Sequence, residues 1–236
     1  MSKRILLITG WGVGIAPLQA LQTALQQQGH CVELMDIFDA QQPDALQKAV
    51  QQAQLADILI GWSLGGQLAL LLAHTLWQRF QQAKPVICLA SNPCFVANVT
   101  WPHAMPENEF HRFKQQFLNN PAATLKQFYL NICTGQPALK QNWSFLLTHA
   151  NPPQKIELIQ GLLQLQSLHL CDILRTYPAP IHFVFAEQDT LVPSKVQQNI
   201  LQIATKNVSV QLLENAGHSF PVFDIQQTLQ AIDTFL

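Results

Sequence analysis

The chain has 236 residues, of which 48% are hydrophobic and only 11% are charged, and its formal net charge at pH 7 is −1. This length and apolar fraction suit one α/β domain with an insertion, or two small domains, around a sizeable core. A near-neutral chain lacks the basic face that nucleic-acid binding needs, so no nucleic-acid partner is expected.

The cysteines and the apolar runs indicate the compartment. The five cysteines are scattered, without C-x-x-C or metal-ligand spacing, which favours small buried side chains in a reducing compartment over a disulfide framework. The first apolar run, residues 5–8, is too short for the core of a signal peptide. No uninterrupted apolar stretch approaches the length of a membrane span. We therefore expect a cytoplasmic protein without a membrane segment.

Short apolar runs alternate with longer helical patterns, which is typical of a mostly parallel sheet covered by helices on both faces. In chain order, strands are predicted over residues 4–9, 31–35, 57–60, 85–90, 181–186 and 208–213. The helices that alternate with these strands along the chain are predicted over residues 17–28, 43–54, 64–80, 193–204 and 224–236. The fold class is therefore predicted to be α/β.

The alternation stops after residue 90. Four helical patterns follow without a convincing strand, separated by prolines that begin or end helices, over residues 107–119, 122–133, 139–150 and 154–168. We predict a core formed by residues 1–97 and 170–236, with a helical lid inserted over residues 98–169. The alternative is a separate helical domain without a part in catalysis.

A candidate nucleophile lies between the third strand and the helix after it. Ser63 is the centre of Gly61-Trp62-Ser63-Leu64-Gly65. A serine on such a strand–turn–helix is how an α/β-hydrolase exposes its nucleophile, with glycines giving room around the strained turn. A turn with an incidental serine is the alternative.

A serine hydroxyl needs a base to take its proton and a carboxylate to orient that base. In α/β-hydrolases these follow the serine in the order acid, then histidine. Asp189 lies in the loop after the strand 181–186, and His218 lies in the loop after the strand 208–213. Glu187 is the rival acid, closer to its strand end. The sequence therefore predicts the catalytic set Ser63, Asp189 and His218.

Metal chemistry is not predicted. The remaining seven histidines occupy strands, helices or the insertion, and no pair of them has a metal-ligand pattern with a carboxylate nearby. We expect no metal and no cofactor.

Two backbone N–H groups are expected to form an oxyanion hole. One belongs to Leu64, directly after the nucleophile, and the other to Trp11, in the loop after the first strand. The side chains of Trp11 and Trp62 are candidates for walls of an acyl pocket, or are ordinary core aromatics.

Several motifs together resemble one family. They are residues 10–12 (Gly-Trp-Gly), 61–66 around Ser63, 89–95 (Leu-Ala-Ser-Asn-Pro-Cys-Phe) followed by Trp101-Pro102, and 189–193 (Asp-Thr-Leu-Val-Pro). They resemble the pimeloyl-[acyl-carrier protein] methyl ester esterases of biotin synthesis, over most of the chain. The resemblance implies an α/β-hydrolase fold and hydrolysis of the distal methyl ester to pimeloyl-[acyl-carrier protein] and methanol. It also implies a substrate-contacting lid phenylalanine, for which Phe128 is the candidate, with the buried face of a lid helix as its alternative role.

The resemblance further implies that basic lid residues meet an acidic carrier protein. This chain departs from that pattern, because Arg112 is the only arginine of the insertion. Residues 98–169 nevertheless hold five Lys or Arg against three Asp or Glu, whereas the remainder holds eight against eleven. A positively charged lid would steer an acidic partner toward the cleft. The alternative is that the surplus of basic residues arises by chance on a solvated helix surface. The candidate carrier contacts are Arg112, Lys114, Lys126 and Lys140.

Three functions follow as hypotheses. The first is the carrier-protein methyl esterase, acting as a monomer on the acyl-carrier protein that bears methyl pimelate. The second is a general carboxylesterase for short- to medium-chain acyl esters with the same triad. The third is a catalytically silent hydrolase-fold protein that binds a ligand.

Overall fold

In the computed structural model, which describes residues 1–203 and 205–236, one six-stranded sheet organises the chain. All neighbouring strands are parallel, in the order β2-β1-β3-β4-β5-β6. The six predicted strands are confirmed, as β1 (Arg4–Ile8), β2 (Cys31–Met35), β3 (Ile58–Trp62), β4 (Val86–Leu89), β5 (Ile181–Ala186) and β6 (Val208–Leu213). The predicted α/β fold with a parallel sheet is therefore confirmed.

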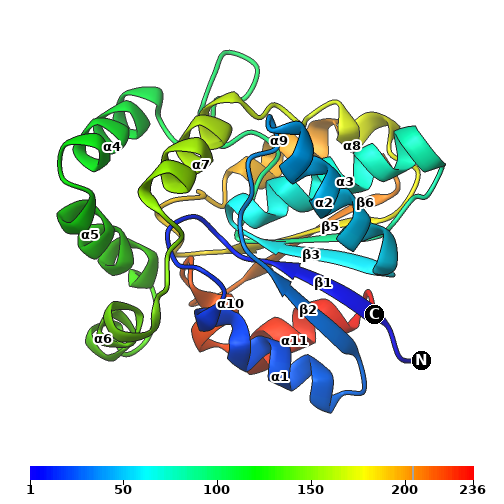
Figure 1. The fold of residues 1–236 in the computed structure, drawn as a ribbon, viewed down its shortest axis with the longest axis horizontal. Helices are drawn as coiled ribbons and strands as arrows, with labels where there is room; N and C mark the ends of the chain where they lie inside the picture. The colour runs from blue at the N-terminus through cyan, green and yellow to red at the C-terminus, as the bar shows by residue number, and fades with distance from the viewer. Residues whose placement is uncertain (204) are drawn as a thin grey trace.

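Helices cover both faces of this sheet (Figure 1). One face carries α2 (Pro43–Leu55) and α3 (Leu64–Phe80), and the other carries α1 (Gln19–Gln27), α10 (Phe220–Phe223) and α11 (Ile225–Asp233). Strands β3, β4 and β5 are buried at every residue, as continuous apolar runs between two helical layers require. The sheet core thus forms a rigid base whose carboxyl edge carries the connecting loops.

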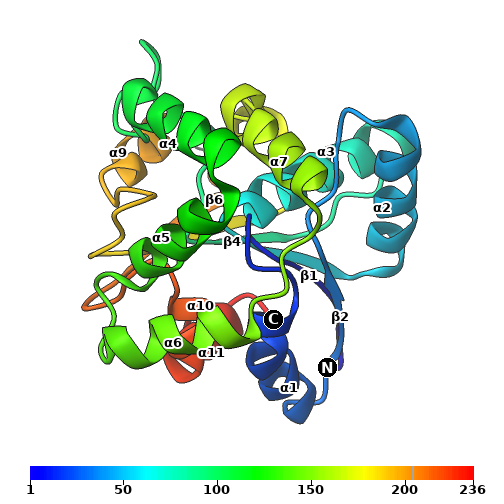
Figure 2. The ribbon, with the colours of Figure 1, turned by 60° about the vertical axis from the view of Figure 1, so that its left-hand side comes forward.

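The segment between β4 and β5 is helical, as predicted. It contains α4 (Glu107–Asn119), α5 (Pro121–Cys133), α6 (Leu139–His149), α7 (Lys155–Ser167) and a short α8 (Ile173–Thr176). Figures 1 and 2 show α4, α5 and α6 standing beside the sheet core. Helix α5 begins one residue earlier than predicted, because Asn120 accepts a hydrogen bond from the Ala123 N–H and Pro121 fits the first turn.

Other predicted helices also have different bounds in the structure. The C-terminal helix predicted over 224–236 is shorter, as α11 (Ile225–Asp233), because Asp224 lies outside helical geometry at φ −124° and caps this helix by accepting from the Gln227 N–H. The short helix α10, directly before Asp224, was not predicted. The helix predicted over 193–204 begins later, as α9 (Val196–Ile203), after a turn. Its predicted end at residue 204 lies outside the described residues. A short 3-10 helix, η1 (Ala16–Leu18), precedes α1 where one helix from residue 17 was predicted.

Buried hydrogen bonds attach the helical segment to the loop that follows β1. The Tyr129 hydroxyl of α5 donates to the Gly12 carbonyl at 2.9 Å, and the Trp11 indole N–H donates to the Leu158 carbonyl of α7 at 2.7 Å. Burial raises the pKa of Tyr129 to about 12, so its hydroxyl stays a donor at neutral pH. Among the described residues, no helix is both long and apolar enough to cross a membrane.

Replacing Tyr129 with phenylalanine tests this attachment. The Gly12 carbonyl would lose its buried donor, and the free energy of unfolding should fall by about 1 kcal/mol. Urea denaturation of Tyr129→Phe beside the wild type measures the change. An unchanged midpoint would show that the contact does not stabilise the fold.

Candidate active site

The turn between β3 and α3 holds Ser63 in an unusual backbone conformation. Its φ is 56° and its ψ is −123°, outside the regions that L-residues normally occupy. Two backbone hydrogen bonds fix it: the Ser63 N–H donates to the Leu89 carbonyl, and the Gly66 N–H donates to the Ser63 carbonyl, both at 2.9 Å. The serine is thereby raised at the carboxyl end of β3.

The glycines around this turn are required by packing. A Cβ on Gly61 would lie 2.1 Å from the Gly65 carbonyl oxygen, and a Cβ on Gly65 would lie 2.4 Å from the carbonyl oxygens of Ile8 and Thr9. Real Cβ atoms do not approach backbone so closely. The Gly-x-Ser-x-Gly motif is therefore a consequence of close backbone contact within the turn, at Gly61, and between the turn and the end of β1, at Gly65.

A buried histidine–carboxylate pair lies at the ends of two further strands. His218 Nδ1 is 2.7 Å from Asp189 Oδ2, and both side chains are almost completely buried. The other carboxylate oxygen, Oδ1, accepts from the N–H groups of Leu191 and Val192 at 2.8 and 2.9 Å. Nδ1 therefore carries the proton that it donates to Asp189, and Nε2, which has no hydrogen-bond partner among the described residues, is left as an acceptor.

Asp189, and not Glu187, orients the histidine. The Glu187 carboxylate is exposed and accepts from the Asn215 N–H at 3.0 Å, so it braces the loop before His218. The loop is also tied to the residue before the serine, because the Trp62 indole N–H donates to the His218 carbonyl at 2.9 Å. These contacts bring the histidine loop against the Ser63 turn.

The loop after β1 also reaches the serine. A Cβ on Gly10 would lie 3.1 Å from Ser63 Cβ, so the backbone next to Trp11 lies beside the nucleophile candidate. Within the described residues, no hydrogen bond from the backbone N–H of Trp11 or Leu64 to another protein group is present. Both N–H groups are free to donate to a substrate oxygen, which is the property an oxyanion hole needs.

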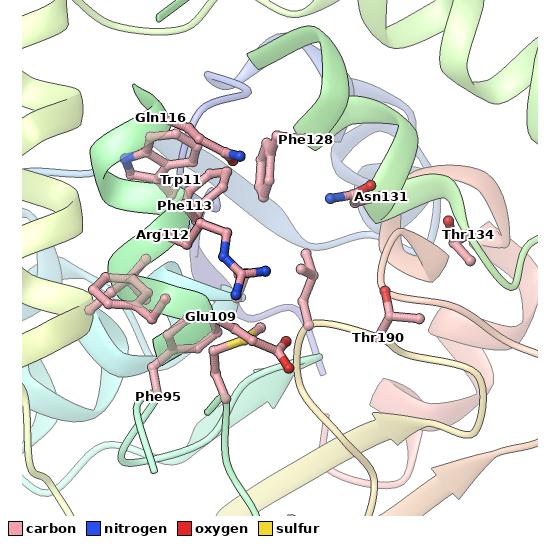
Figure 3. A pocket seen from close by; sticks show the side chains of 15 residues that line it. Trp11, Phe95, Glu109, Arg112, Phe113, Gln116, Phe128, Asn131, Thr134 and Thr190 are labelled. Carbon is pink, nitrogen blue, oxygen red and sulfur yellow. The ribbon is translucent and has the colours of Figure 1, made fainter. Parts of the chain in front are cut away.

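Ser63 lines a cavity of about 560 Å³ between the sheet edge and the helical segment (Figure 3). Apolar side chains form most of its wall: Trp11, Phe95, Met105, Phe110, Phe113, Phe128, Leu165 and Leu191. Trp11 makes edge-to-face contacts with Phe113, Phe117 and Phe128, at centroid distances of 4.9 to 5.4 Å. Phe128 therefore both belongs to the buried face of α5 and lines the cavity.

Polar residues of this cavity were not predicted from the sequence as a group. They are Glu109, Arg112, Gln116, Asn131, Thr134 and Thr190, which Figure 3 shows around the cavity. Glu109, Arg112 and Gln116 follow one another at helical spacing on α4, which is the one signal that could have grouped them.

The four predicted carrier contacts do not all face this cavity. Only Arg112 lines it. The Lys114 ammonium donates to Gln166 Oε1 at 2.6 Å, and the Lys126 ammonium lies 5.6 Å from the centre of the Trp143 ring. Lys140 is exposed at the start of α6.

The end of α5 packs on the loops that carry the histidine–carboxylate pair. The buried Gln136 side chain donates to the Gly217 carbonyl at 3.2 Å. A Cβ on Gly217 would lie 2.2 Å from the Thr134 carbonyl oxygen, and a Cβ on Gly135 would lie 2.6 Å from Gln188 Cβ. The helical segment therefore contributes directly to the position of the His218 loop.

Ser63 lies in a strand–turn–helix elbow, and a buried His–Asp pair follows two further strands of the same parallel sheet. Two backbone N–H groups without an acceptor among the described residues lie in the loop after β1 and at the start of α3. This arrangement is typical of an α/β-hydrolase. The family described as the alpha/beta hydrolase family matches residues 5–231, and the chain belongs to it. The expected α/β-hydrolase fold is thus confirmed. Solved structures agree on the fold: a bromoperoxidase from Bacillus anthracis superposes with a TM-score of 0.79 at 15% identity, covering 100% of this chain and 92% of that one.

Comparison with curated relatives indicates a group within this family that the chain resembles. A pimeloyl-[acyl-carrier protein] methyl ester esterase from Aliivibrio fischeri is 26% identical over 98% of this chain and 93% of its own length. A relative of the same name from Shewanella sp. is 29% identical over 98% of this chain and 90% of its length. The biotin biosynthesis bifunctional protein BioHC of Cellvibrio japonicus is 28% identical over 98% of this chain, which spans only 47% of that protein. The resemblance seen in the sequence motifs is confirmed.

Substitution of Gly217 by alanine tests the packing of α5 on the histidine loop. The added methyl group would meet the Thr134 carbonyl oxygen, so either the loop or the end of α5 must move. The free energy of unfolding should fall by about 1–3 kcal/mol, as for other overpacked sites. Hydrogen exchange of residues 134–136 should rise in Gly217→Ala. Unchanged exchange and stability would exclude this contact.

Proposed function

We propose that this protein is a serine carboxylesterase that hydrolyses the methyl ester of pimeloyl-[acyl-carrier protein] methyl ester, releasing pimeloyl-[acyl-carrier protein] and methanol in biotin synthesis. The observation that carries the proposal is the Ser63 elbow lining a cavity of about 560 Å³ whose wall is mostly apolar and also holds polar side chains. Relatives that bear this name over nearly the whole chain support it.

In the proposed mechanism, Ser63 Oγ attacks the ester carbonyl carbon while His218 Nε2 takes the hydroxyl proton. Asp189 holds the imidazole through Nδ1 and stabilises its charged form. The N–H groups of Trp11 and Leu64 receive the developing oxyanion. Collapse of the tetrahedral intermediate expels methoxide, which leaves as methanol with the proton from His218. Water, activated by the same imidazole, then attacks the acyl-enzyme and releases the carboxylic acid.

The two parts of the cavity suit the two parts of this substrate. Aromatic walls, among them Trp11 and Phe128, accommodate the methylene chain without competing hydrogen bonds. The side-chain amides of Gln116 and Asn131, which line the cavity, can pair with the amides of a pantetheine arm, and Arg112 supplies the positive charge that an acidic carrier protein would meet. We propose that residues 98–169 act as the lid on a core of residues 1–97 and 170–236, and that the enzyme works as a monomer.

The alternative is a general carboxylesterase for short- to medium-chain acyl esters. One observation favours it: of the basic residues predicted to meet the carrier, Lys114 and Lys126 are engaged with Gln166 and Trp143. Both functions use the same serine chemistry, and they differ in whether the carrier protein contributes to binding.

Replacement of Ser63 by alanine tests the shared chemistry. Because the members of a catalytic triad act as a unit, turnover should fall by about a millionfold. Methanol release from the methyl ester measures it, and Ser144→Ala, at an exposed position of α6, is the matched control. Turnover by Ser63→Ala within tenfold of the wild type would exclude Ser63 as the nucleophile.

Ionic strength separates the two functions. If the carrier protein binds through the lid charge, kcat/KM for the carrier-linked ester should fall as salt rises, while a short free methyl ester should show no such dependence. Arg112→Gln should lower the carrier-linked value by about 2- to 5-fold, the effect of one exposed ion pair. Lys48→Gln, on α2, is the control. Equal salt profiles for both esters would favour the general carboxylesterase.

A further inference from the structure

The chain enters and leaves the helical segment through two stretches that lie side by side. Cys94 and His169 form an antiparallel β-bridge. Next to it, the Leu170 N–H donates to the Pro93 carbonyl at 2.9 Å. This pairing brings Cys94 and Cys171, which are distant in the sequence, to one junction between the helical segment and the sheet core.

The Cys94 thiol donates to the Val96 carbonyl at 3.3 Å, and two side chains that favour the thiolate lie near its sulfur. His169 Nδ1 lies 3.2 Å from it, and the Asn98 side-chain amide donates to it at 3.4 Å. Hydrogen bonding from Cys171 is the largest influence, followed by the charge of His169, and together they lower the pKa of Cys94 despite its burial. Cys88 shows the contrast, because its pKa is raised by burial alone.

Cys171 is the complementary member of the pair. Its thiol interacts with Cys94, which raises the pKa of Cys171, and Asp172 adds to this rise while Arg175 opposes it. Of the two thiols, Cys94 is therefore the more readily deprotonated. Cys94 is only 1% exposed, but Cys171 beside it is half-buried and His169 is exposed, so the cluster lies just beneath the protein surface. None of these side chains lines the cavity at Ser63, and the hydrolytic mechanism does not use them.

We propose that Cys94 and Cys171 are a redox-sensitive thiol pair, which a peroxide converts to a disulfide that ties together the two stretches joining the helical segment to the core. A paired thiolate and thiol beside an imidazole is the arrangement that makes cysteines reactive, whereas isolated buried thiols are inert. The inference is independent of the proposed esterase function.

The oxidation takes place in two steps. The Cys94 thiolate attacks one oxygen of hydrogen peroxide, an S–O bond forms, the O–O bond breaks, and hydroxide leaves and is protonated to water. The Cys171 sulfur then attacks the sulfenic sulfur of Cys94, an S–S bond forms, the S–O bond breaks, and a second water leaves with the Cys171 proton. Two thiols give up two electrons and peroxide is reduced to two waters. An external dithiol reverses the reaction by exchange.

Mass spectrometry of the whole protein tests the pair. After treatment with hydrogen peroxide and alkylation of the remaining thiols, a non-reducing digest should contain the peptides of Cys94 and Cys171 joined with the loss of two hydrogens. Dithiothreitol should restore both to full alkylation. Recovery of both as alkylated thiols, at a peroxide dose that oxidises the exposed Cys31, would overturn the proposal.

Two variants sharpen the result. Cys171→Ser should leave no disulfide at Cys94 and should let its sulfenic acid accumulate, which a dimedone probe detects as a mass increase. Cys31→Ser should form the Cys94–Cys171 disulfide at the wild-type rate. A disulfide that forms instead between Cys31 and either junction cysteine would overturn the assignment. The wild-type peptide map decides the question even if Cys171→Ser does not fold.

Discussion

The backbone of Ser63, at φ 56° and ψ −123°, costs about 1–3 kcal/mol relative to an ordinary conformation. It persists because the surroundings allow no relaxation: Gly61 and Gly65 press against backbone so closely that neither could carry a side chain. This strain lifts the hydroxyl off the main chain at the carboxyl end of β3. The free N–H of Leu64 and the cavity wall then follow from the same turn, because α3 starts there.

The position of His218 depends on both the core and the helical segment. Asp189 orients its ring and Trp62 holds its carbonyl, and both belong to the sheet core. Gln136, from the helical segment, holds the neighbouring carbonyl of Gly217. A movement of the helical segment that admits substrate would therefore also act on the base.

Local patterns made much of this predictable from the sequence. The six strands are apolar runs of the right length, and Ser63 and His218 each lie in a loop or turn that follows a strand. The glycines on either side of Ser63 are required by close backbone contacts. Features made by distant pairings were not predictable: the Gln136 contact and the bridge between Cys94 and His169 join residues separated by many elements. The short helix α10 was not predicted, because four residues are too few to show a helical period.

The most direct measurement is a crystal structure of the protein inactivated by a methyl alkylphosphonate, which mimics the tetrahedral intermediate of ester hydrolysis. We predict phosphorus bonded to Ser63 Oγ, with a phosphoryl oxygen within about 2.7–3.1 Å of the N–H groups of Trp11 and Leu64, the range for oxyanion donors. His218 Nε2 should lie within hydrogen-bonding distance of a phosphonate oxygen, with the alkyl chain against Phe128. Phosphorus on another residue, or an oxygen facing solvent away from both N–H groups, would contradict it.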